Sequence, residues 1–295
     1  MAAMRGKSIN LFLMDGTASG RIKCTLANWT GVAYKIPRTE LDKCKERDDL
    51  KRSGVYFLFG TSDQTGEKVA YIGQAGARKN GEGILFRLQE HKRNPDKDYW
   101  TEAVVFTTSN NSFGPTEISY LENRFCNLAT ESNRYIVKNG NDPTSGNVTE
   151  EKESELEEFI DYAKIVMGTF GHRIFEPLIE LPSIPKVELV GTDNEPMLYL
   201  KTAKANAKGR RTSEGFVVFK GCTVSTNPTK SCPDTILHLR KQYAERIDNN
   251  ILTEDTLFKS PSAAAGFVTY GSANGLILWS TDDGRTLKEI ENTEF

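Results

Sequence analysis

The chain has 295 residues and carries 38 basic and 40 acidic side chains, which give a formal net charge of -2 at pH 7. This length favours two folded units with a sizeable core, and the composition is that of an ordinary soluble globular protein. The small net charge argues neither for nor against nucleic acid. Any such affinity has to come from local basic patches.

The sequence also excludes several classes of protein. No apolar run approaches the ~20 residues of a membrane span, and the start of the chain lacks the apolar core of a secretion signal. The five cysteines are odd in number without the spacing of metal ligands, and the three histidines are too scattered for a zinc site. We therefore expect free thiols, a cytoplasmic location and no membrane association.

The N-terminal segment, residues 1–50, alternates apolar and polar side chains over residues 8–36. Asp15-Gly16 and Gly20 supply turns, so this pattern predicts two or three antiparallel strands. A short helix is expected after Pro37, capped by Thr39. We expect this segment to be a β-hairpin extension of the sheet that follows it.

A second hairpin is predicted between residues 54 and 73, GVYFLFGTSDQTGEKVAYIG. Two short runs rich in Val, Tyr and Phe flank a polar segment with turn residues, which is typical of paired strands. Each strand offers one tyrosine beside a glycine, namely Tyr56 and Tyr71. Taken alone, the hairpin favours the interpretation of both tyrosines as half-buried sheet aromatics.

A helix is predicted over Ile84–Arg93, followed by a strand over residues 102–107. Arg87 and His91 are spaced i, i+4, so they lie one turn apart on one face of this helix. The glycine-rich basic loop before it, residues 74–84, is suited to approach a phosphate closely. It is equally well explained as a solvated surface loop.

A further helix is predicted over residues 115–129, and it contains two acids of different character. Glu117 lies in the first turn, where a carboxylate complements the helix dipole. Glu122 has apolar helical neighbours, and a carboxylate in such a position is costly unless it is paired or bound to a cation. The alternative to a cation is an ion pair with a nearby arginine, for which Arg87 is available.

Residues 134–147 form a loop rich in asparagine and glycine. Asn133 and Asn139 are both explained as ordinary turn residues. An acidic amphipathic helix follows over residues 150–170. Its charge would repel a phosphate backbone, so we expect it to lie away from any path of DNA.

These side chains occur in an order that resembles the GIY-YIG nuclease family, whose two tripeptides are GVY and YIG in this chain. The resemblance covers residues 54–139 and implies an α+β nuclease domain over residues 51–180, with a small mixed or antiparallel three-stranded sheet flanked by helices. The first tripeptide departs from the family at its middle residue, and the 14 residues between the two tyrosines exceed the usual gap. The site residues implied are Tyr56, Tyr71, Arg87, His91, Glu122 and, as the asparagine that the family places downstream of the glutamate, Asn139, with Asn133 its competitor on spacing.

The resemblance implies hydrolysis of DNA phosphodiesters with a single Mg²⁺, for which Mn²⁺ is a possible substitute. Glu122 would hold the metal, and Arg87 would clamp the phosphate through paired N–H donors. Tyr56 would take the proton from water, which is demanding because a free phenol has a pKa near ~10. His91 would lower that pKa or relay the proton, and Tyr71 would position the water or the phosphate.

Residues 181–197 contain three prolines and are predicted to be a linker. The second unit, residues 198–295, is expected to be a small α+β domain with a strand over residues 216–219 and a helix over residues 236–247. Its first part is a basic run with no acid before Glu214, which either binds phosphate backbones or protects an exposed strand edge. The basic residues of this run are Lys201, Lys204, Lys208, Arg210 and Arg211.

The C-terminal segment, SPSAAAGFVTYGSANGLILWSTDDGRTL, resembles an uncharacterised domain often fused behind bacterial GIY-YIG modules. It is also similar to the restriction-and-adenine-methylase-associated domain through residues 260–264, Asn274-Gly275 and Trp279. That likeness implies an accessory that reads modified DNA. The alternative is structural, with small residues for tight helix packing, Asn-Gly as a turn and Trp279 in the core.

Three functions follow from these patterns. The leading one is a Mg²⁺-dependent DNA endonuclease, plausible in restriction, phage defence or mobile-element biology. The second is a non-cleaving protein that recognises modified DNA through residues 198–295. The third is a repair incision nuclease that works with a partner, for which no residue of the chain argues specifically.

Overall fold

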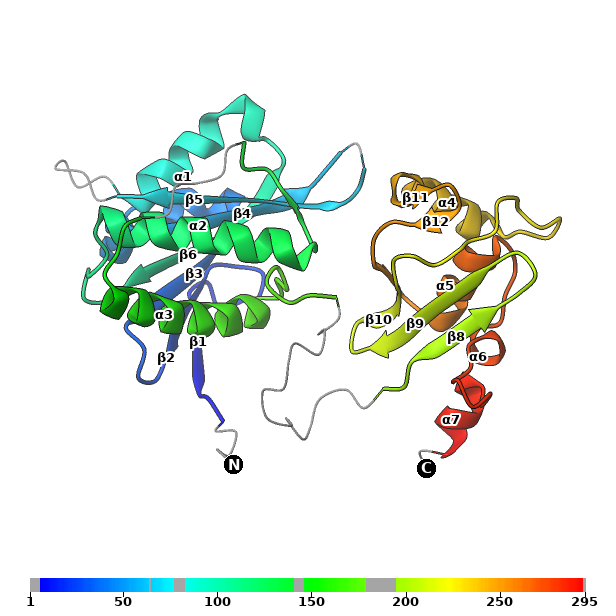
Figure 1. Ribbon diagram of the computed structural model, residues 1–295. Helices are drawn as coiled ribbons and strands as arrows, with labels where there is room; N and C mark the ends of the chain where they lie inside the picture. The colour runs from blue at the N-terminus through cyan, green and yellow to red at the C-terminus, as the bar shows by residue number, and fades with distance from the viewer. Residues whose placement is uncertain (1–5, 64, 77–82, 141–145, 179–194, 294–295) are drawn as a thin grey trace. The chain divides into compact units, whose positions relative to one another are not determined.

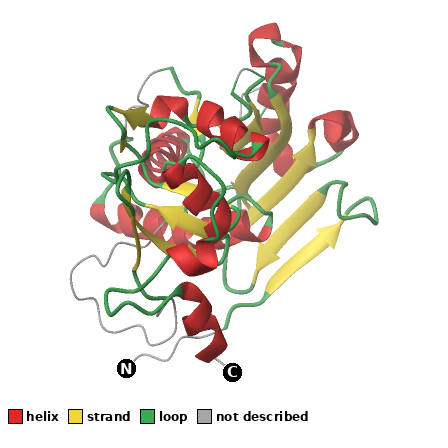
Figure 2. Ribbon diagram, turned by 90° about the vertical axis from the view of Figure 1, so that its right-hand side faces the viewer, coloured by secondary structure: helices red, strands yellow, loops and turns green. Residues whose placement is uncertain are grey.

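The computed structural model describes residues 6–63, 65–76, 83–140, 146–178 and 195–293. The chain divides into two compact units, Met1–Pro177 and Leu178–Phe295. Each unit contains both helices and strands, so the protein belongs to the α+β class (Figures 1 and 2). The linker expected over residues 181–197 lies for the most part outside the described residues.

Within the described residues, the first unit contains one seven-stranded sheet. All neighbouring strands in it are antiparallel except the outermost pair, β5 and β7, which run parallel. The first three strands of the chain continue the same sheet as the hairpin of residues 54–73. In spatial order the strands are β1 (Ile9–Leu13), β2 (Ile22–Leu26), β3 (Gly31–Pro37), β6 (Trp100–Thr108), β4 (Gly54–Thr61), β5 (Lys68–Ala75) and β7 (Ile136–Val137).

Three α-helices accompany this sheet in the described residues: α1 (Ile84–Arg93), α2 (Pro115–Ser132) and α3 (Glu150–Thr169). The bounds of α1 are those that the sequence predicts, and α2 continues beyond its predicted end. The short helix expected after Pro37 is a 3₁₀ helix, η1 (Arg38–Cys44), and it has no side-chain cap. Two further 3₁₀ turns are η2 (Asp48–Lys51) and η3 (Pro95–Lys97).

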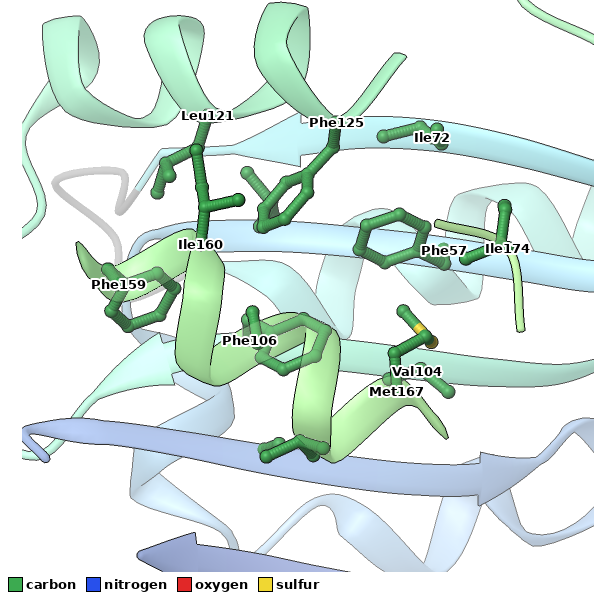
Figure 3. Close-up of a cluster of buried hydrophobic side chains, with 14 of the residues drawn as sticks. Phe57, Ile72, Val104, Phe106, Leu121, Phe125, Phe159, Ile160, Met167 and Ile174 are labelled. Carbon is green, nitrogen blue, oxygen red and sulfur yellow. The ribbon is translucent and has the colours of Figure 1, made fainter. Parts of the chain in front are cut away.

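One face of the sheet packs against α2 and α3 (Figure 3). Phe57 and Phe106 of the central strands meet Phe125 of α2 at ring-centroid distances of 5.3 Å and 6.2 Å. Burying an aromatic or aliphatic side chain of this size contributes about 1.5–3 kcal/mol each. This cluster is therefore a main source of stability for the unit, and it holds α2 in place along β4 and β5.

The opposite face packs against α1 and the two 3₁₀ turns that precede β4. Leu58 and Tyr56 of β4 lie on this face together with Ile84 and Leu88 of α1, all buried. Because side chains alternate along a strand, Phe57 belongs to the other face. The sequence pattern of β4 thus assigns its tyrosine to the side of the sheet where α1 lies.

The second unit contains a four-stranded antiparallel sheet within the described residues, with its inner face covered by helices. In spatial order the strands are β13 (Thr256–Phe258), β10 (Gly215–Val218), β9 (Asn206–Thr212) and β8 (Leu198–Lys201). The helices are α4 (Asp234–Gln242), α5 (Pro261–Thr269), α6 (Gly275–Leu278) and α7 (Leu287–Thr293), with the 3₁₀ turn η4 (Ala244–Arg246). Trp279 and Phe216 are fully buried in the core, with ring centroids 4.6 Å apart.

The helix predicted over residues 236–247 is too long at its C-terminal end. The α-helix ends at Gln242, and Ile247 lies instead in β11 (Ile247–Asp248), paired with β12 (Ile251–Leu252). The turn between these strands places Asn249 and Asn250 at φ angles of 47° and 65°. A two-residue hairpin favours positive φ at both central positions, and asparagine tolerates it. This turn therefore takes Ile247 into a strand despite its helical spacing.

None of the helices in the described residues combines the length and the apolar character that a membrane crossing requires.

Candidate active site

Two tyrosines occupy neighbouring positions on the α1 face of the sheet. The pairing of β4 with β5 places Tyr56 opposite Gly73 and Tyr71 opposite Leu58. Tyr56 and Tyr71 therefore share a face as diagonal neighbours, and their ring centroids are 6.3 Å apart. Tyr56 is only 1 % exposed, whereas Tyr71 is half-buried. Solvent thus reaches this pair through Tyr71.

Gly73 leaves room for the ring of Tyr56. A Cβ atom at Gly73 would overlap the hydroxyl and the adjoining ring carbons of Tyr56. The Tyr56 side chain therefore lies directly over the backbone of the neighbouring strand. Because Gly73 has no side chain, the phenol ring of Tyr56 can occupy this position.

Replacing Gly73 by alanine is expected to lower the free energy of unfolding by about 1–3 kcal/mol, because the buried Tyr56 ring has to move. Gly76 provides the matched control, since a Cβ there meets only Ile118 Cδ1 at 3.9 Å. Urea unfolding of both variants measures the difference. Equal stabilities of the two variants would contradict the packing of Tyr56 over Gly73.

Helix α1 brings Arg87 and His91 to the same place. The Tyr56 hydroxyl is 2.6 Å from His91 Nε2, and the ring centroids of His91 and Tyr71 are 5.4 Å apart. Arg87 interacts with the Tyr56 hydroxyl and also donates to Glu90 Oε2 at 2.7 Å. Its side chain is 42 % exposed, so the guanidinium keeps access to a ligand from solvent.

The protonation states of this pair follow from burial. Burial raises the pKa of Tyr56 above its ordinary value, and Tyr71 adds to that effect while Arg87 opposes it. Burial also lowers the pKa of His91 to about 4, with Lys97 and Arg87 contributing in the same direction. At neutral pH the phenol is therefore protonated and the imidazole neutral, and in the tautomer that carries its proton on Nδ1 the Tyr56 hydroxyl donates to His91 Nε2.

Acid is expected to destabilise the protein through His91. The unfolded chain takes up this proton near the ordinary histidine pKa of about 6.5, whereas the folded chain resists it down to about 4. The free energy of unfolding should therefore fall by about 3 kcal/mol as pH drops from about 6.5 to about 4. Above pH 6.5 this contribution is fully present.

Urea unfolding of wild type and His91→Gln across this pH range isolates the effect, because the variant lacks the titrating ring. His238 is exposed on α4, and His238→Gln is the control that should keep the wild-type pH dependence. If the free energy of unfolding falls equally with pH in wild type and in His91→Gln, His91 is not the cause of the acid destabilisation.

Glu122 reaches the same region from α2 on the other side of the sheet. Its Oε2 accepts a hydrogen bond from Gln74 Nε2 at 2.9 Å, and Gln74 also bonds to Ser119 Oγ at 3.1 Å. Burial raises the pKa of Glu122, while Gln74 and Arg87 lower it. The Glu122 carboxylate is in turn close enough to raise the pKa of Tyr71.

The alternative of an ion pair between Glu122 and Arg87 does not occur in the described structure. Arg87 forms its ion pair with Glu90, one helical turn away on α1. Glu122 is half-buried and is held by an amide rather than by a cation. Its charge therefore remains available to a ligand that carries positive charge.

The two candidate asparagines have different positions. Asn139 Oδ1 accepts from Ile72 N at 3.0 Å and its Nδ2 donates to Ile72 O at 2.7 Å, so it acts as a strand partner beside Tyr71. Asn133 is the left-handed C-cap of α2, at φ 51°. Asn139 is thus the asparagine next to the tyrosines.

Two residues of this region were not predicted from the sequence. Gln74 directly follows the YIG tripeptide and orients Glu122. Lys97 places Nζ 3.2 Å from the ring centroid of Tyr71, and burial lowers its pKa to about 8, with Arg87 adding to the shift. The alternation of side chains along β5 places Gln74 on the α2 face, so the sequence could have predicted its position near Glu122. No local sequence pattern predicts that Lys97 lies near Tyr71.

Glu122 is the carboxylate of this region that could hold a metal ion. Across the described parts of the chain, no three His, Cys, Asp or Glu side chains gather into a metal-holding group. Mg²⁺ in proteins commonly takes one or two carboxylates and completes its shell with waters and substrate phosphates. Glu122 supplies one such carboxylate. Residues 77–82 and 141–145 lie outside the described residues.

The C-terminal residues that carry a likeness to modified-DNA readers have structural positions. Ser260 caps α5 by accepting from Ala263 N at 3.1 Å, and Asn274 caps α6 by accepting from Leu276 N at 3.1 Å. Trp279 is buried and donates from Nε1 to Pro261 O at 3.0 Å. These contacts give Ser260, Asn274 and Trp279 roles in folding.

Comparison with known proteins gives a family match for the second unit. A family profile described as a domain of unknown function (DUF4357) matches residues 198–291. No curated protein and no solved structure gives a significant match to the chain. The match covers less than half of the chain and carries no stated function.

Proposed function

We propose that this protein is a divalent-metal-dependent DNA endonuclease that hydrolyses phosphodiester bonds in the manner of the GIY-YIG family. The observation that carries the proposal is the convergence of side chains on the Tyr56 hydroxyl. His91 Nε2 lies within hydrogen-bond distance of it, Arg87 interacts with it, and Tyr71 lies diagonally beside it. The carboxylate of Glu122 is close enough to raise the pKa of Tyr56.

The contact between Tyr56 and His91 supports a proton path. Water that attacks phosphorus must lose a proton, but the raised pKa of Tyr56 makes a free phenolate unavailable at neutral pH. Tyr56 can accept the water proton on its oxygen while it passes its own proton to His91 Nε2, 2.6 Å away. The new bond joins the water oxygen to phosphorus, and the bond from phosphorus to the leaving sugar oxygen breaks.

Arg87 is suited to hold the phosphate. A guanidinium presents paired N–H donors that match two phosphate oxygens. The ion pair with Glu90 at 2.7 Å is partly exposed, so it contributes little to stability and can share the guanidinium with a substrate. Arg87 is therefore the phosphate-binding side chain in this proposal.

Glu122 would hold the divalent cation, with Gln74 keeping the carboxylate in place. When bound, Mg²⁺ supplies Lewis-acid polarisation of the phosphate and stabilisation of the leaving oxygen. Because Glu122 is half-buried and has no ion-pair partner in the described structure, keeping its carboxylate charged costs free energy. Binding of a cation would offset this cost.

Incubation of purified protein with plasmid DNA tests the function. Nicked or linear products are expected with Mg²⁺ or Mn²⁺, and none in excess EDTA. Methylated plasmid, unmethylated plasmid and single strands run in parallel identify the substrate class and bear on a setting in restriction or phage defence. Intact DNA in every arm, with protein shown to be folded, would overturn the proposal and favour a non-cleaving DNA-binding protein.

A further inference from the structure

The hairpin of β8 and β9 carries a concentration of positive charge. Its residues, 198–212, include five basic side chains and no acid. The register pairs Tyr199 with Lys208 and Leu200 with Ala207. Leu200 and Ala207 face the buried core, so Tyr199 and Lys208 face the opposite side of the sheet.

Alternation along the two strands places three basic side chains on this outer face. Lys201 follows Tyr199 by two residues in β8, and Arg210 follows Lys208 by two residues in β9. Lys204 lies in the turn between the strands. We call Lys201, Lys204, Lys208 and Arg210 the basic hairpin; its three lysines are exposed and Arg210 is half-buried.

Arg211, the fifth basic residue of the run, has a different role. It donates to Glu195 Oε2 at 2.7 Å and to Glu291 Oε1 at 3.2 Å, so its charge is neutralised within the unit. No described carboxylate forms a salt bridge with a residue of the basic hairpin. Two of its ammonium groups lie instead over aromatic rings, Lys201 over Tyr199 at 5.9 Å and Lys208 over Phe219 at 5.6 Å.

Protection of a strand edge does not explain this pattern. Charges that prevent edge-to-edge pairing belong on the outermost strand, and Lys201 at the end of β8 fits that role. Lys208 and Arg210 lie on β9, which is an inner strand between β8 and β10. The positions of Lys208 and Arg210 are about 7 Å apart along the strand, which is within one Debye length, so their like charges repel each other.

We propose that the basic hairpin binds the phosphate backbone of DNA. This inference rests on the proposed function, which makes DNA the substrate. A polyanion relieves the mutual repulsion of the unpaired cations and releases its own condensed counterions. The helices of the unit pack on the other face of the sheet through residues such as Phe267 and Leu287, so they leave the hairpin side chains free to contact DNA.

Binding of the full chain to a duplex oligonucleotide in EDTA, measured across a salt series, tests the inference without cleavage. Lys208→Ala/Arg210→Ala should weaken binding by about tenfold or more and reduce the slope of log Kobs against log salt by about 2. Lys201→Ala/Lys204→Ala, in which only exposed side chains change, should also weaken duplex binding and reduce the salt slope. Thermal unfolding confirms that each variant is folded.

Lys241→Ala/Lys288→Ala is the matched control, because it removes two exposed charges from α4 and α7 on the other side of the sheet. It should retain wild-type affinity and slope. Wild-type affinity and slope in both hairpin variants, or equal losses in the control, would overturn the inference. Failure of the proposed nuclease function would appear separately, as intact plasmid in the Mg²⁺ assay despite normal duplex binding.

Discussion

Glu122→Gln is expected to reduce Mg²⁺-dependent DNA cleavage by at least about a thousandfold. The substitution keeps the size of the side chain and its hydrogen bond with Gln74, but it removes the carboxylate charge that would hold the metal ion. A metal ion contributes several kcal/mol of charge stabilisation in the transition state, and each 1.36 kcal/mol corresponds to about a tenfold change in rate. Single-turnover cleavage at saturating protein measures the loss.

Glu117→Gln is the matched control on the same helix. Glu117 Oε2 accepts from Gly114 N at 3.0 Å in the first turn of α2, where its role is to cap the helix. Its replacement should lower the free energy of unfolding by less than about 1 kcal/mol and leave the cleavage rate unchanged. A cleavage rate for Glu122→Gln equal to that of Glu117→Gln would remove the metal-binding role of Glu122.

Tyr56→Phe is expected to reduce the cleavage rate by about 10²–10⁴, the usual contribution of a positioned general base. The ring remains over Gly73, so the fold is kept, but the hydroxyl that links an attacking water to His91 is lost. The buried imidazole also loses its partner, which costs about 1–3 kcal/mol of stability. Cleavage rates and urea unfolding separate these two effects.

Tyr34→Phe controls for the loss of a buried hydroxyl. Tyr34 lies in the same cluster as Tyr56 and is fully buried, and its hydroxyl donates to Asp49 Oδ2 at 2.6 Å. This variant should be destabilised to a comparable extent and yet cleave DNA at the wild-type rate. If both variants cleave equally well, Tyr56 is a structural aromatic of the sheet, which is the simpler explanation of its position.

Local patterns in the sequence were sufficient for several elements. The apolar spacing of α1 predicted its bounds, because its buried face, Ile84, Leu85 and Leu88, recurs at helical intervals. The position of Glu117 in the first turn of α2 predicted a carboxylate that complements the helix dipole, and this carboxylate bonds to the N-cap backbone. These features depend on residues within one or two turns, which is the range that sequence patterns cover well.

Patterns of this range could not separate residues whose roles depend on distant parts of the chain. In the sequence, Arg211 belongs to the same basic run as Lys208. In the structure, Arg211 forms salt bridges with Glu195 and Glu291, which lie near the first and last residues of the second unit. Ile247 fits the spacing of a helix, yet the turn at the following asparagines takes it into a strand.

The sequence by itself determined the two tyrosine strands and the helix that presents Arg87 and His91 on one face, because each rests on short-range periodicity. Tertiary structure alone decided that Tyr56 pairs with His91, that Gln74 rather than Arg87 holds Glu122, and that Asn139 rather than Asn133 lies beside Tyr71. Those choices depend on strand register and on how α1 and α2 pack across the sheet. Such contacts join residues dozens of positions apart, and their geometry exists only once the core has formed.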